Sequence, residues 1–227
     1  MMHGFHATPV EASLFGVLAI ASLLLAFVML GSRWLRHYLI AFAAESWAIA
    51  ALSAAVGYID HYPELYVIAL LTLAFRGTLL PYLLLRIIRR LTIERELEPL
   101  LRPGSSLVLG AGAVVFSLVV AARMTQALHL TAEVVVLALT VMLSMKLIGY
   151  LMLAVRHEAV SHVLGLLVLE NGIFLGTQIL VPGMPMLLEL VILFDLLIVV
   201  VCFGVLVRYL VGQVGSTSAL QLRRLVG

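Results

Sequence analysis

The sequence contains few charged residues and almost no cysteine. Only 11% of its 227 residues are Asp, Glu, Lys or Arg, whereas soluble domains carry about a quarter. This shortage of charge excludes an ordinary soluble domain. The single cysteine, Cys202, excludes an intrachain disulfide, a CxxC motif and an iron–sulfur cluster site. The seven histidines fall at expected helix ends or in loops without a metal-ligand spacing, so we predict no metal site in this chain.

The sequence is instead rich in long apolar runs. Apolar residues make up 63% of the chain, and they form continuous runs close to the roughly 20 residues that a membrane-crossing helix needs. Strands of a membrane barrel would alternate in polarity over about ten residues. We therefore predict an all-α membrane protein, a bundle of about seven transmembrane helices. The expected spans are 11–31, 38–58, 65–88, 106–123, 132–154, 159–180 and 186–209.

Basic residues collect on one side of these spans. Of the 14 Lys and Arg residues, 11 fall in the connections after the first, third and fifth spans and in the C-terminal tail. Arg123 lies on the opposite side, while Arg76 and Lys146 fall inside spans. The positive-inside rule then predicts an N-terminus outside the cell and a cytoplasmic C-terminus. The basic side is expected to contact anionic lipid headgroups rather than nucleic acid.

The chain also shows signs of an internal duplication. A proline, a mid-span ionisable residue and an arginine recur at intervals of 13 residues: Pro63, Arg76 and Arg89, and again Pro182, Asp195 and Arg208. Each set follows a basic loop and an intramembrane glutamate, Glu45 or Glu170. This layout suggests a three-helix unit used twice. Residues 1–105 would form the first unit with its cytoplasmic loop, 106–131 a connecting helix, and 132–227 the second unit.

Ionisable residues inside the spans are the candidates for function. By insertion scales, an acid near the centre of a membrane helix costs roughly 2.5–3.5 kcal/mol, so we infer a role for Glu170. At a rise of about 1.5 Å per residue, Arg76, Lys146 and Asp195 are expected near the same midplane level. Glu45 lies closer to the cytoplasmic end of its expected span, 38–58, and should be shallower.

These residues could carry protons or could form structural ion pairs. Burial favours the neutral form of a carboxyl group and a neighbouring base favours its ionised form, so a pair can be switched by moving the base. We predict that Glu170 and Asp195 carry protons, that Lys146 and Arg76 tune them, and that Glu45 belongs to the same proton-transfer set. The alternative is that the charges are structural salt bridges between helices.

Weaker candidates lie nearby. Glu189 is close to the outer end of the last span, and Asn171 is expected to make a hydrogen bond between helices. Glycines within the spans are expected to allow close helix packing. They are Gly110, Gly112, Gly149, Gly165, Gly172 and Gly176.

The C-terminal half resembles hydrogenase-4 component E. The matching residues are Arg156–Gly176 (RHEAVSHVLGLLVLENGIFLG), followed by VPGMPMLLELVILFDLLIVVVCFGVLVRYL and by GSTSALQLRRL. Component E is a membrane subunit of energy-converting group 4 hydrogenases and related complexes. The same half is similar to subunit K of respiratory complex I and to its counterpart in the Mrp multisubunit sodium/proton antiporters. The resemblance is specific across about 132–226 and weaker, though similar in layout, across 11–100.

In subunit K, two buried acids on successive helices lie on the proton-translocation axis. The first corresponds to Glu170. The second corresponds to Asp195, because an arginine, here Arg208, follows at the same distance in both proteins. This chain has aspartate where subunit K has glutamate, which shortens the side chain by one methylene. In the first unit, Arg76 stands at the position that corresponds to Asp195.

The resemblance implies a proton-translocating or coupling subunit of a complex I-like oxidoreductase in a prokaryotic inner (cell) membrane. Its implied partners are antiporter-like membrane subunits and the membrane anchor of a catalytic arm. It implies no redox centre, cofactor or catalytic residue in this chain. The alternative function is a purely structural membrane adaptor that joins those subunits.

Overall fold

The structure of the protein is a computed structural model that describes residues 9–32, 34–59, 63–90, 101–129, 133–156 and 159–180, and the isolated positions 197, 201, 204 and 205. The described residues are almost entirely helical and include no β-strand. Within them, five helical stretches are long and apolar enough to cross a membrane. The predicted all-helical fold is therefore confirmed for the described residues, and these five stretches are compatible with the predicted multi-pass membrane protein.

The helices are joined by short connections. In chain order they are α1 (Pro9–Gly31), α2 (Leu35–Ile59), α3 (Pro63–Leu71), η1 (Thr72–Leu79), α4 (Leu80–Arg90), α5 (Pro103–Ala127), α6 (Glu133–Val155) and α7 (Ala159–Leu180). Proline is the first residue of α1, α3 and α5, where its missing N–H leaves no helical hydrogen bond unmade. The first six expected spans coincide with these helices. The seventh, 186–209, falls outside the described residues apart from isolated positions and stays a prediction.

The third span departs from a regular α-helix. It is a continuous rod of α3, η1 and α4, and η1 is a π-helix in which the Leu80 N–H donates to the carbonyl of Phe75, five residues earlier. Such wide turns are rare and are frequently found at functional sites. The predicted span at 65–88 is present as a helical rod, and its π-helical segment Thr72–Leu79 was not predicted from the sequence.

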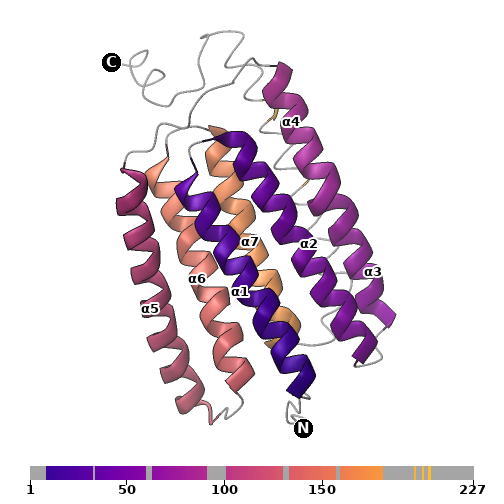
Figure 1. Ribbon diagram of the computed structural model, residues 1–227, viewed down its shortest axis with the longest axis vertical. Coiled ribbons are helices and arrows are strands. Elements are labelled where there is room, and N and C mark those ends of the chain that lie inside the picture. Colours follow the sequence, from indigo (N-terminus) through magenta and orange to yellow (C-terminus); the bar gives the residue numbers. More distant parts are fainter. Residues whose placement is uncertain are drawn as a thin grey trace.

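The helices run side by side, with α5 at one edge of the bundle and the α3–η1–α4 rod at the other (Figure 1). Successive helices pack as pairs, α1 with α2, α5 with α6, and α6 with α7. Contacts also join α1 with α6 and α2 with α7. In the predicted duplication, α1 of the first unit corresponds to α6 of the second, and α2 corresponds to α7. The duplication itself stays a prediction.

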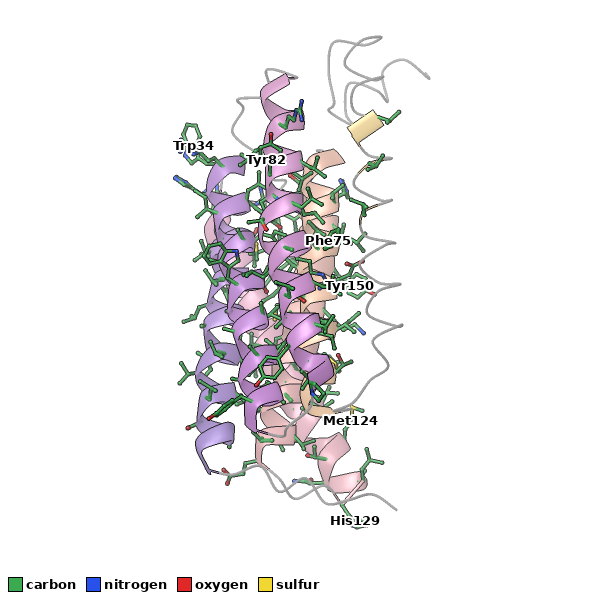
Figure 2. The ribbon with its side chains drawn as sticks, turned by 90° about the vertical axis from the view of Figure 1, so that its right-hand side faces the viewer. Trp34, Phe75, Tyr82, Met124, His129 and Tyr150 are labelled. Atoms are coloured by element: carbon green, nitrogen blue, oxygen red, sulfur yellow. The ribbon has the colours of Figure 1, made fainter. Side chains whose placement is uncertain are left out.

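Two exposed aromatic residues, Trp34 and Tyr82, lie near one end of the bundle. Figure 2 shows Trp34 and Tyr82 projecting outward toward the same end, with His129 at the opposite end. Trp34 is 53% exposed and Tyr82 is 59% exposed. Amphipathic aromatic rings are typical of the boundary between hydrocarbon and headgroups. Their position is at the end that the loop charges predict to be cytoplasmic.

Glycines bring α6 and α7 into close contact. A Cβ atom added to Gly149 would lie 2.8 Å from the carbonyl oxygen of Gly165, and one added to Gly165 would lie 3.2 Å from that of Gly149. A Cβ on Gly172 or Gly176 would meet methionine side chains of α6 at 2.7 and 2.6 Å. The predicted close packing is confirmed at these positions. It is wrong at Gly112, where an added Cβ would meet nothing within 4 Å.

Replacing Gly149 by alanine should destabilise the bundle, because the new methyl group forces α6 and α7 apart. Overpacking of this kind costs about 1–3 kcal/mol. Thermal unfolding of the purified protein in detergent should show a lower midpoint for Gly149→Ala. The matched control is Gly112→Ala, whose methyl group points into open space and should leave the midpoint unchanged or slightly higher. Equal midpoints for the two variants would contradict the close α6–α7 contact.

Candidate functional site

Arg76 lies in the π-helix η1, and its side chain is only 1% exposed. Its guanidinium group contacts α7 in three ways. The Nη1 atom donates a hydrogen bond to Oδ1 of Asn171 at 3.0 Å. The Nη2 atom lies 3.7 Å from Oε2 of Glu170. The guanidinium carbon also lies 5.2 Å from the centre of the Phe174 ring, which is within cation–π distance.

The spacing of the three α7 residues explains this arrangement. Glu170 and Phe174 are four residues apart and therefore share one face of the helix. Asn171 is displaced by about 100° around the axis, the angle between successive residues at 3.6 per turn. The planar guanidinium fork, with its five N–H donors, can reach both directions at once. Asn171 thus makes the hydrogen bond between helices that the sequence predicted.

Glu45 of α2 joins the same cluster. It is completely buried, and its carboxyl group interacts electrostatically with Arg76 and with the Asn171 amide. The contact to Asn171 does not have hydrogen-bond geometry, since neither carboxyl oxygen of Glu45 nor Nδ2 of Asn171 has a hydrogen-bond partner among the described residues. We use the term buried charge cluster for Glu45, Arg76, Glu170 and Asn171.

The depth expected for Glu45 needs correction. We placed it shallower than Glu170, because the second span was expected to begin at residue 38. Helix α2 instead begins at Leu35, so Glu45 comes ten residues after its start, and Glu170 comes eleven residues after the start of α7 at Ala159. Both helices begin at the same end of the bundle (Figure 1). The two glutamates therefore lie at nearly the same level.

The composition of the cluster determines what it can do chemically. It holds one cation and two carboxyl groups, and an uncompensated charge in a buried site is strongly disfavoured. A single proton on either glutamate makes the cluster neutral, with Arg76 paired to the other. The Glu170 side chain keeps 19% exposure, whereas that of Arg76 keeps 1%. The arrangement can therefore hold one proton on either of its two glutamates.

The remaining predicted site residues are not part of the buried charge cluster as described above. Lys146 lies on α6, is half-buried, and makes no hydrogen bond or ion pair with another described residue. Its predicted tuning role therefore stays a prediction. Asp195 and Glu189 lie outside the described residues. Over the part of the chain that the structure describes, no group of three His, Cys, Asp or Glu side chains could hold a metal ion.

A second buried arginine, Arg156, follows α6 and contacts the end of α1 and the start of α2. The Arg156 Nη2 atom donates to the carbonyl oxygens of Leu30 at 3.2 Å and Ser32 at 2.8 Å, and the guanidinium lies 5.9 Å from the Tyr38 ring centre. The hydroxyl of Tyr38 in turn donates to the sulfur of Met152 at 3.3 Å. Because Arg156 follows the fifth expected span, 132–154, it was counted among the basic residues of the connections. It is only 3% exposed, because the last carbonyls of α1 lack helical partners and accept its hydrogen bonds.

The described helices are compatible with a multi-pass membrane protein, and a curated relative supplies the family. The chain is 31% identical over 211 residues to the "Uncharacterized protein Rv0085" of Mycobacterium tuberculosis (strain ATCC 25618 / H37Rv), an alignment that covers 92% of this chain and 93% of the relative. The chain belongs to the same family as that protein. No family model and no solved structure matches it. The name of the relative states no activity, so the resemblance to hydrogenase-4 component E stays a prediction.

Arg76→Met should lower the free energy of unfolding by about 3–5 kcal/mol, because it leaves buried carboxyl groups without their cation. Equilibrium unfolding in detergent would measure the change. Arg123→Met is the matched control, since Arg123 is exposed on α5 and its loss should have little effect. Adding Glu170→Gln to Arg76→Met should recover part of the loss. If the two substitutions were simply additive, Arg76 and Glu170 would not form a stabilising pair.

Proposed function

We propose that this protein is a proton-translocating or coupling membrane subunit of an energy-converting, hydrogenase-4-like oxidoreductase complex related to complex I. The observation that carries the proposal is the buried charge cluster, in which one arginine lies between carboxyl groups of α2 and α7. Ionisable groups inside membrane helices are expensive and typically mark ion pathways or proton relays. The resemblance described above supplies the kind of complex.

The cluster supports proton transfer through two neutral states. In one, the proton is on Glu45 and Arg76 pairs with ionised Glu170, as the 3.7 Å contact favours. In the other, the proton is on Glu170 and Arg76 pairs with ionised Glu45. The conversion moves one proton from a carboxyl oxygen of one glutamate to a carboxyl oxygen of the other, and shifts the guanidinium between them. Motion of a neighbouring subunit that displaces Arg76 would drive the exchange in one direction.

The remaining parts of the proposal come from the resemblance and from the loop charges. Asp195 would continue the proton path beyond Glu170, with Lys146 as a further tuning base. The partners would be antiporter-like membrane subunits and the membrane anchor of a catalytic arm, which would hold any redox centre. The N-terminus would face outward and the C-terminus the cytoplasm of a prokaryotic inner membrane.

Two experiments on native membranes test the proposal. A tag on this chain should co-purify, in mild detergent, antiporter-like and catalytic-arm subunits that mass spectrometry can identify. Inverted vesicles that contain the intact complex should then acidify when supplied with an electron donor such as hydrogen, formate or carbon monoxide. In Glu170→Gln, acidification should be lost while assembly and electron transfer are retained, because glutamine cannot bind and release the proton.

The matched control is Glu133→Gln, an exposed position at the start of α6, which should pump like the unmodified protein. If Glu170→Gln assembles and also pumps normally, Glu170 is dispensable for translocation, and the chain is a structural adaptor in which the buried charges join helices. If the chain co-purifies with no such subunits, the proposed complex is wrong.

A further inference from the structure

Trp47 of α2 reaches the π-helical segment that carries Arg76. Its indole Nε1 atom donates a hydrogen bond to the carbonyl oxygen of Gly77 at 3.1 Å. The approach depends on glycine, because a Cβ atom on Gly77 would lie 2.5 Å from Cδ1 and 2.6 Å from Nε1 of the indole. Trp47 thus contacts Gly77, the residue that follows Arg76 in η1.

The Gly77 carbonyl of η1 needs a side-chain donor, because the residue four positions further on is Pro81, which has no N–H. A π-helical turn is less favourable than an α-helical one, and in hydrocarbon a carbonyl oxygen can find a donor only within the protein. Two side chains supply donors to η1. One is the indole of Trp47, and the other is the hydroxyl of Thr78, which lies 2.8 Å from the carbonyl oxygen of Leu73 and 2.7 Å from that of Ala74.

The register of η1 determines the direction of Arg76. Successive residues of an α-helix are separated by about 100° around the axis, and a wide turn accommodates one residue more than an α-turn does. Returning Thr72–Leu79 to α-helical register would therefore rotate one part of the span against the other by about that angle. The guanidinium of Arg76 would then turn away from Asn171 and Glu170 on α7.

We propose that Trp47 is a positioning residue for the buried charge cluster. Its indole N–H holds the π-helical register through the Gly77 carbonyl, and that register directs Arg76 at Glu170 and Asn171. The geometric part stands on the contacts alone, whereas its consequence for proton transfer rests on the proposed function. The indole is 54% exposed on the outside of the bundle, so it can be exchanged without emptying the core.

The direct test replaces Trp47 by phenylalanine, which keeps an aromatic ring and removes the N–H donor. The full-length protein, labelled with ¹⁵N-arginine and ¹³C-glutamate, is reconstituted into lipid bilayers. Solid-state NMR then measures the dipolar contact between guanidinium nitrogen and glutamate carboxyl carbon, assigned by its absence in Arg76→Met. We expect this contact to be lost in Trp47→Phe. Trp34→Phe is the matched control and should keep it, since Trp34 projects outward near the end of the bundle (Figure 2).

Gly77→Ala provides a second variant. It keeps the tryptophan at position 47, but the added methyl group pushes the indole away from the carbonyl of residue 77. It should lose the same contact. If Trp47→Phe and Gly77→Ala both keep the Arg76–Glu170 contact, the positioning role is overturned. Vesicle acidification by the intact complex separates this inference from the proposed function. Loss of the contact with unchanged proton pumping would support the role of Trp47 and would refute proton transfer through the cluster.

Discussion

The buried guanidinium group of Arg76 is the constraint on which the rest of this bundle depends. Inside a membrane bundle a cation needs partners at its own depth, because lipid supplies none. Helix α7 supplies Asn171, Glu170 and the Phe174 ring, and α2 supplies Glu45. Arg76 therefore joins its own span to α7, and it interacts electrostatically with Glu45 of α2. In the function proposed above, the two glutamates share this cation and each can bind a proton.

The surrounding packing fixes the level at which these partners meet. Backbone contact between Gly149 and Gly165 sets how α7 lies along α6. Arg156 fastens the end of α6 to the last carbonyls of α1 and stacks on Tyr38 near the start of α2. These contacts together fix the positions of α2, which carries Glu45, and α7, which carries Glu170, relative to α1 and α6. A shift of one helical residue, about 1.5 Å, would move a carboxylate from contact with Arg76 to a longer, weaker distance.

Much of the fold could be predicted from the sequence, because hydrophobic length alone identifies membrane helices. The same reasoning expected Arg76 and Glu170 at one depth, and the structure places them in contact. Depth was misjudged for Glu45, because the boundary of α2 was set by hydropathy, whereas the helix begins earlier, at Leu35. A boundary error of about three residues changes the expected depth by about 4.5 Å.

Other features could not be predicted because they arise from tertiary contacts. The π-helix has no periodicity signal of its own. Pro81 removes the α-helical donor to the Gly77 carbonyl, but the indole of Trp47 that bonds this carbonyl lies 30 residues away in sequence. The burial of Arg156 depends on orphan carbonyls of another helix. Gly112 matched the composition of a packing interface but faces away from its neighbours, since a glycine in a sequence does not show which side of the helix is covered.

The most direct measurement of a shared arginine is infrared difference spectroscopy of the protein in lipid bilayers across a range of pH. The carbonyl stretching bands of protonated Glu45 and Glu170 can be assigned by their loss in Glu45→Gln and Glu170→Gln. If Arg76 is shared, removal of either glutamate changes the pH at which the other gains its proton, and the dependence disappears in Arg76→Met. If each glutamate titrates at the same pH whether or not the other is present, the two carboxyl groups do not form a coupled unit.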